Sequence, residues 1–221
     1  LDPADPVSIG AMVGPEAFTE VRFLAHAKQQ QALQLIPAWA SEFKRIFGRA
    51  SGGLTHGYRL DDAETVVVAL GSVLGTIKDT VDEMREQGLK IGVLGITCFR
   101  PWPTAAVREA LAGAKRVLVL EKSLAVGLGG IVSNHVSASY HGASDDVYTV
   151  IAGLGGRAIT RGSLHRIFAA AAEGSLEPIT FLDLDYSLVD RVLAREREHR
   201  RSGPIAEGIL RDLGVVAAKI G

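Results

Sequence analysis

Three short apolar runs in the middle of the chain constrain its fold more than any other feature. They lie at Thr65–Leu70, Ile91–Thr97 and Arg116–Leu120, and their β-branched and aliphatic residues are typical of strands buried on both faces. The two segments between them carry apolar residues at the three- and four-residue spacing of a helix. This alternation predicts an α/β domain built on an open, mostly parallel sheet with helices on both faces.

Further elements extend this unit in both directions. Val147–Ala152 and Ile179–Leu182 predict a fourth and a fifth strand on the carboxyl side. Before the unit, Val7–Val13 has the pattern of a short strand, and a long amphipathic helix interrupted at Pro37 should end at Gly48. We therefore divide the chain into residues 1–60 (strand, long helix and a linker over residues 51–59), an α/β domain over residues 61–184 and a helical tail over residues 185–221.

Composition excludes several classes of protein. With 24 Lys and Arg against 25 Asp and Glu, the net charge is −1, and no basic stripe indicates a nucleic-acid or membrane partner. The single cysteine, Cys98, rules out an internal disulfide framework and a cysteine-built zinc or iron–sulfur site. No apolar run approaches the roughly 20 residues that span a bilayer. We expect a soluble, cytoplasmic protein, and the start at Leu1 rather than Met leads us to expect a longer polypeptide upstream.

A glycine-containing turn follows the first strand of the central unit. Gly71, Ser72, Gly75 and Thr76 stand between this strand and the next helix, where backbone N–H groups can hold a phosphate. The turn matches neither G-x-G-x-x-G nor the P-loop pattern. Two interpretations stay open, a close-packed strand–helix turn and an anion-binding loop.

Two further glycine turns lie at the predicted carboxyl ends of later strands. They are Gly127–Gly130 and Gly153–Gly156. Open α/β sheets bind ligands at this edge. Without a phosphate fingerprint, we favour a close backbone approach to a neighbouring domain or subunit over a cofactor site.

Arg100 is the most notable charged residue. It lies within Phe99-Arg100-Pro101-Trp102-Pro103, where prolines and aromatic rings would hold a guanidinium rigidly for a carboxylate or phosphate. An ordinary structural salt bridge is the competing interpretation. The histidines form no metal-binding pattern, no nucleophile elbow is present, and Cys98 should be a buried, inert thiol. We therefore predict no catalytic residue and no metal site in this chain.

Several segments in combination resemble the alpha subunit of the 2-oxoacid:ferredoxin oxidoreductases, the group that includes pyruvate:ferredoxin oxidoreductase. The segments are Leu1-Asp2-Pro3 with Gly14-Pro15-Glu16, ALGSVLGTIKDTVDEMREQGLKIGVLGITCFRPWP, LEKSLAVGLGG and IAGLGGRAIT, in that order. They cover most of residues 1–180. The chain departs from the family at Trp102 (usually Phe), Glu121-Lys122 (commonly Asp-Arg) and Ala158 (usually Asp).

The resemblance implies a thiamine-diphosphate-dependent enzyme that oxidatively decarboxylates a 2-oxoacid, passing the acyl group to coenzyme A and electrons through [4Fe-4S] clusters to ferredoxin or another acceptor. It implies that residues 1–60 end a pyrimidine-binding domain and that residues 61–184 are similar to the transketolase C-terminal domain. It also implies partner subunits, namely a thiamine-diphosphate-binding, a gamma and a ferredoxin-like subunit.

The same resemblance places the cofactors outside this chain. We expect residues 1–221 alone to bind no cofactor, to be inactive and to serve structural and subunit-docking roles. The residues that would face a site are Gly71, Ser72, Gly75, Thr76 and Arg100. The alternative is a stand-alone α/β module that binds a nucleotide or an acidic metabolite at the same loops.

Overall fold

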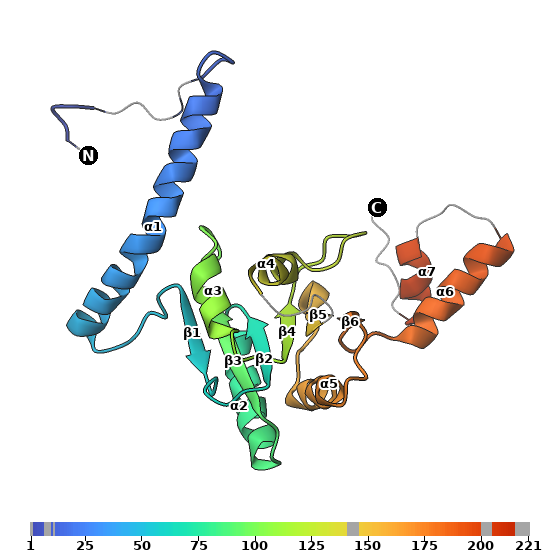
Figure 1. Ribbon diagram of the computed structural model, residues 1–221. Coiled ribbons are helices and arrows are strands. Elements are labelled where there is room, and N and C mark those ends of the chain that lie inside the picture. Colours follow the sequence, from blue (N-terminus) through green and yellow to red (C-terminus); the bar gives the residue numbers. More distant parts are fainter. Residues whose placement is uncertain (1, 7–9, 11, 141–145, 200–204, 215–221) are drawn as a thin grey trace. The chain divides into compact units, whose positions relative to one another are not determined.

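The computed structural model describes residues 2–6, 10, 12–140, 146–199 and 205–214. The chain divides into two compact units, Leu1–Thr180 and Phe181–Gly221. The first unit contains a six-stranded sheet in the order β1-β3-β2-β4-β5-β6 (Figure 1). The strands are β1 (Thr55–Tyr58), β2 (Thr65–Ala69), β3 (Ile91–Ile96), β4 (Arg116–Glu121), β5 (Val147–Ile151) and β6 (Ile179–Phe181).

The centre of the sheet is parallel, as the sequence predicts. β2 pairs in parallel with β3 and with β4, and β4 pairs in parallel with β5. The chain moves from β2 to β3 on one side and then crosses to β4 on the other, so the strand order reverses at β2. Such a reversal leaves a crevice at the carboxyl edge of an open α/β sheet.

Helices cover both faces of the sheet, which confirms the predicted fold class. The helix α2 (Val73–Glu86) contacts α5 (Arg161–Glu173) on one side. On the other, α3 (Thr104–Ala110) contacts α4 (Ile131–Ser139) (Figure 1). The inward stripe of α2 explains its packing, because Leu74, Ile77, Val81 and Met84 recur at helical spacing and are all buried.

The strands of the core are hydrophobic on both sides, because each is covered by helices. Every residue of β2 and β3 is buried, and β4 is buried from its second residue on. Phe168 of α5 is among the largest side chains that are fully buried. The strand pattern in the sequence therefore predicted these elements to within one or two residues.

The segment before the sheet departs from two of the predictions. The long helix α1 (Phe18–Phe47) continues through Pro37 without a break and ends at Gly48, which has a positive φ of 69°. Residues 55–58 are a strand, β1, rather than part of a linker, because they pair antiparallel with the edge of β3. Residues 7–9 and 11 of the predicted strand Val7–Val13 lie outside the described residues.

Two helix ends on the second face are defined by the backbone. Pro103 occupies the N-cap position of α3, and no side chain caps that helix. The α4 helix ends at Ser139. Within the described part of the chain, no helix is both long and apolar enough to cross a membrane.

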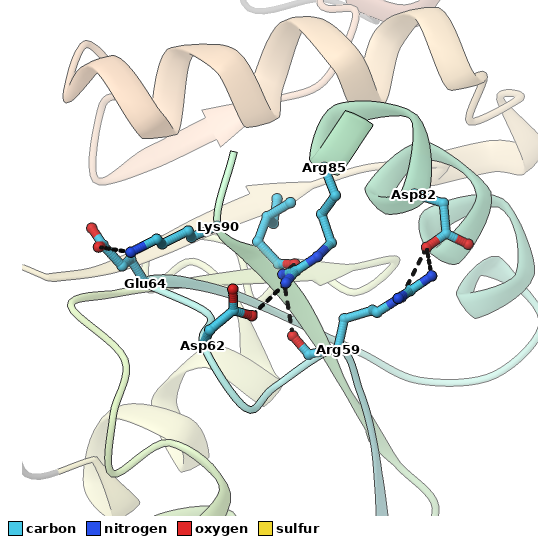
Figure 2. Close-up of polar contacts among 7 residues, drawn as sticks. Arg59, Asp62, Glu64, Asp82, Arg85 and Lys90 are labelled. Carbon is cyan, nitrogen blue, oxygen red and sulfur yellow. Dashed lines mark hydrogen bonds and ion pairs between the residues drawn. The ribbon is translucent and has the colours of Figure 1, made fainter. Parts of the chain in front are cut away.

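Ion pairs connect the segment that follows the antiparallel edge strand β1 to the helix α2 (Figure 2). Arg85 of α2 donates to the carbonyl oxygen of Ile91 at 2.8 Å and to the carboxylate of Asp62. Arg59 contacts Asp82 at 3.2 Å. The hydrogen bond from Arg85 is the main cause that lowers the pKa of Asp62. This cluster lies at the amino ends of β2 and β3, away from the carboxyl edge, so we assign it a structural role.

Gly92 provides a test of how tightly this edge is packed. A Cβ at Gly92 of β3 would lie 2.5 Å from the carbonyl oxygen of Arg59. We expect Gly92→Ala to reduce the free energy of unfolding by about 2 kcal/mol, because backbone rather than a flexible side chain must move. Gly113→Ala is the control, since its Cβ would meet nothing within 4 Å. Equal denaturation midpoints for the two variants would contradict this packing.

The second unit contains two helices, α6 (Tyr186–His199) and α7 (Ile205–Asp212). They contact each other, and Arg195 of α6 forms an ion pair with Asp212 of α7 at 3.0 Å. Both helices fall within the predicted helical tail. The structure begins the unit at Phe181, whereas the sequence placed the boundary after residue 184.

Candidate functional site

The carboxyl ends of the parallel strands β2, β3, β4 and β5 lie at one edge of the sheet. Each strand is followed there by a loop that the sequence singled out: Gly71–Thr76, Phe99–Pro103, Gly127–Gly130 and Gly153–Gly156. The parallel register brings these four loops to the same edge. We therefore describe this edge as the candidate functional site.

Arg100 lies in the loop after β3 and contacts a histidine that sequence reasoning did not select. Its guanidinium donates to the carbonyl oxygen of Phe99 at 2.8 Å and meets Nε2 of His135, on α4, at 2.8 Å. Nδ1 of His135 lies 2.9 Å from the carbonyl oxygen of Ile131. A carbonyl can only accept, so Nδ1 carries the proton and Nε2 accepts from Arg100.

Aromatic rings surround this pair. Phe99 and Trp102 lie 5.5 Å and 5.2 Å from the His135 ring, centroid to centroid. The Arg100 guanidinium also stacks over Phe99, 4.1 Å from its centroid. Nε1 of Trp102 donates to Ser139 at 2.9 Å. The loop is therefore held by contacts with α4. The contacts of Arg100 with Phe99 and His135 are not salt bridges, which was the competing interpretation from the sequence.

The Gly71–Thr76 turn leads away from Arg100. It begins α2, which covers the opposite face of the sheet from α3 and α4. Gly71 has a φ of 75°, which explains the glycine, and no side chain caps the first turn of α2. The structure therefore places the predicted site residues at one edge but divides them between two faces. A cofactor-binding role for Gly71, Ser72, Gly75 and Thr76 stays a prediction.

Glu121, at the end of β4, is a second residue of this edge that the sequence did not select for chemistry. Its side chain is 4% exposed and accepts hydrogen bonds from the backbone N–H groups of Ile131, Val132 and Ser133 at 2.8–3.0 Å. The hydroxyl of Ser123 donates a fourth, at 2.6 Å. The carboxylate therefore caps the amino end of α4 from a neighbouring strand.

Opposing effects act on the pKa of Glu121. Burial alone would raise this pKa, but the hydrogen bonds from Ser123 and from the backbone of α4 together lower it below its ordinary value. Glu121 is therefore ionised at neutral pH. Because α4 carries His135, the same carboxylate holds in place the helix that positions Arg100.

The two later glycine turns present apolar side chains to solvent. Val126 and Leu128 are 92% and 64% exposed, and Leu154 is 41% exposed. The first turn is closed by hydrogen bonds between Ala125 and Gly129, so its tip is ordered. These exposed aliphatic side chains are compatible with the docking interpretation of the two loops.

Cys98 differs from its prediction. It is half-buried rather than buried, and its thiol donates to the carbonyl oxygen of Pro101 at 3.3 Å. Its role in the structure is to close the loop that holds Arg100.

The residues present do not fit an iron–sulfur cluster, because the whole chain contains one cysteine. The first turn of α2 contains no acidic residue, and a Cβ at Gly71 or Gly75 would meet nothing within 4 Å. Across the described ranges, no group of three His, Cys, Asp or Glu residues could hold the metal ion that accompanies a diphosphate.

Comparison with known proteins gives a consistent result. Residues 63–164 match the family model of pyruvate:ferredoxin oxidoreductase core domain II. The pyruvate synthase subunit PorA of Methanosarcina barkeri is 39% identical over 86% of this chain, and that of Thermotoga maritima is 36% identical over 80%. The alpha subunit of an NADH-dependent phenylglyoxylate dehydrogenase from Aromatoleum evansii is 32% identical over 80% of this chain.

The chain spans less than half of each of these relatives: 49%, 45% and 46% of their lengths, in the same order. Among solved structures, a 2-oxoglutarate:ferredoxin oxidoreductase from Magnetococcus marinus is similar with a TM-score of 0.44 and 19% identity. That similarity covers 58% of this chain and 21% of the other. A split-gene transketolase gives a TM-score of 0.38 at 16% identity, covering 55% of this chain and 42% of that one.

Proposed function

Because residues 63–164 belong to the pyruvate:ferredoxin oxidoreductase core domain II family, we propose that this chain is part of the alpha subunit of a 2-oxoacid:acceptor oxidoreductase. The observation that carries the proposal is the identity of 39% with a pyruvate synthase subunit PorA, which extends over 86% of the chain and so beyond the core domain. The reaction of the complete enzyme would be the oxidative decarboxylation of a 2-oxoacid such as pyruvate to the acyl-coenzyme A.

In this proposal the chemistry takes place on other parts of the enzyme. Thiamine diphosphate, when bound, would supply the carbanion chemistry of decarboxylation, and iron–sulfur clusters would take the electrons to ferredoxin or another acceptor. Both would be held by partner subunits or domains, since the chain has one cysteine and its described residues form no metal-binding group that could accompany a diphosphate. Residues 1–60 would belong to a pyrimidine-binding domain, and residues 61–184 would be the docking domain. The cytoplasmic location stays a prediction.

One surface suited to docking is the pair of glycine-turn tips at the carboxyl edge. Val126, Leu128 and Leu154 are exposed there on turns that are closed by their own backbone hydrogen bonds. A partner that covered them would gain apolar burial without having to order the turns first. We propose that these tips contact another part of the enzyme. The glycines of Gly127–Gly130 and Gly153–Gly156 would allow the partner to approach the backbone closely.

The proposal is tested by recovering the chain from its source cells with an affinity tag. The expected result is co-purification of a thiamine-diphosphate-binding subunit and an iron–sulfur protein in fixed proportion to the chain, measured by mass spectrometry and iron content. Recovery of the chain as a monomer without these proteins would contradict the proposal.

A double substitution tests the docking surface. We expect Leu128→Asp with Leu154→Asp to lower recovery of the partners by about tenfold or more, because central apolar contacts each contribute on the order of 1–2 kcal/mol to binding. The thermal midpoint of the purified chain should change little, since Leu128 is 64% and Leu154 is 41% exposed. The control is Leu213→Asp in the second unit, where Leu213 is 55% exposed. Equal loss of partners in the control would contradict the assignment.

A further inference from the structure

A cleft of about 620 Å³ lies beside the Arg100–His135 pair. One wall is the loop after β3 together with α4, and it contributes Arg100, Trp102 and His135. The other wall is α1, which contributes Arg22, Ala25, His26, Gln29 and Gln30. The α1 residues follow the spacing i, i+3, i+4, i+7 and i+8, which places them on one face of that helix.

The lining of the cleft contains basic and amide side chains but, among the described residues, no acidic ones. It brings together two arginines, two histidines and two glutamine amides, and no Asp or Glu is among its described lining residues. In addition, the indole of Trp102 forms part of one wall and is half-buried. A site with several cationic or neutral donors, no carboxylate and one aromatic ring is suited to an anion that carries a planar group.

The two histidines could not be grouped from the sequence. His26 and His135 are far apart along the chain and belong to different helices. His135 is oriented by Ile131 so that Nε2 points to Arg100, which holds the guanidinium at the cleft. The five donors of an arginine exceed the two contacts that Arg100 makes with Phe99 and His135, so N–H groups remain for a ligand.

We propose that this cleft binds an organic phosphate of nucleotide size, with its phosphate on Arg22 and Arg100 and its ring against Trp102. A phosphate monoester suits two arginines because it can carry two negative charges and its oxygens can accept from both guanidinium groups. The volume lies within the range of ordinary small-molecule sites. The inference goes beyond the assembly role proposed above and does not depend on it.

The test uses the complete 221-residue chain in a Trp39→Phe background, so that Trp102 is the only remaining tryptophan. Its fluorescence is titrated with adenosine monophosphate, adenosine and inorganic pyrophosphate at constant ionic strength. The expected result is saturable change with adenosine monophosphate, weaker binding of pyrophosphate and no saturation with adenosine. Equal affinity for adenosine and adenosine monophosphate, or no saturation with any phosphate, would overturn the proposal.

Substitutions then locate the site. Arg100→Gln and Arg22→Gln should each weaken binding of adenosine monophosphate by about tenfold or more, since each removes a charged donor to the phosphate. Arg45→Gln is the matched control, because Arg45 is an exposed arginine of the same helix that does not line the cleft. Equal weakening by Arg45→Gln would show general charge attraction and would overturn the proposal, as would unchanged binding in both test variants.

Discussion

Replacing Glu121 with alanine should destabilise the chain by at least about 3 kcal/mol, because each buried donor left without an acceptor costs roughly 1–3 kcal/mol. Three backbone N–H groups of α4 and the hydroxyl of Ser123 lose their acceptor in this variant. The measurement is the free energy of unfolding from chemical denaturation. Glu86→Gln, at an exposed position of α2, is the control and should leave stability unchanged.

The dependence of this effect on pH identifies the carboxylate charge as its cause. The pKa of Glu121 is lowered in the folded chain, so its contribution is complete at pH values above the ordinary glutamate pKa and is lost as the pH falls through the folded pKa. The stability difference between the native chain and Glu121→Gln should therefore be large at pH 7 and shrink below about pH 4. A difference that stays constant with pH would contradict a charged cap.

Gly130→Ala should produce the second large effect, through the same network. A Cβ at this position would overlap the hydroxyl oxygen of Ser133 and the carboxylate of Glu121. Gly130 itself has an unstrained backbone, with φ −79° and ψ 153°. The expected loss of about 2–3 kcal/mol therefore comes from displacing the carboxylate rather than from backbone strain.

Gly162→Ala is the matched control for this substitution. Gly162 also lies at the start of a helix, α5, but its Cβ would make only ordinary contacts at 3.9 Å and 4.0 Å. Alanine should be neutral or slightly stabilising there, because it favours the helix more than glycine does. A similar thermal midpoint for Gly130→Ala and Gly162→Ala would contradict the prediction, because it would mean that displacing the Glu121 carboxylate costs no stability.

The fold was predictable where the sequence pattern and the burial coincide. Thr65–Ala69 and Ile91–Ile96 are apolar throughout because both faces of these strands are covered, and that pattern is visible without a structure. The edge strand Thr55–Tyr58 was missed because its residues, with glycine at position 57 and polar neighbours, carry no strand pattern. Its conformation comes from pairing with β3, a contact made over about 40 residues of sequence.

The candidate site was predictable only in part, for a similar reason. The rigid loop around Arg100 follows from its prolines and aromatic residues, but the partner His135 lies 35 positions further on and on another helix. In the sequence, Glu121 has only the pattern of the last residue of a strand. Its capping role follows from the position of the amino end of α4 next to it in the fold. Sequence spacing describes neighbours on one element, whereas both of these contacts join separate elements.

The family relationship and the site geometry lead to the same account of this chain. Its core positions loops at one edge of a sheet, and two of these loops, Gly127–Gly130 and Gly153–Gly156, carry exposed aliphatic side chains at or beside their tips. The whole chain contains one cysteine, fewer than an iron–sulfur cluster needs. We therefore propose that catalysis takes place in an assembly of which this chain is one part.

The most direct test measures reduction of a viologen dye by pyruvate with coenzyme A, comparing the chain alone with the assembly recovered from source cells through a tag on the chain. We expect no dye reduction by the chain alone, even with added thiamine diphosphate, and pyruvate-dependent reduction by the recovered assembly. Reduction by the chain alone, or a recovered assembly that is inactive with every 2-oxoacid supplied, would contradict the proposal.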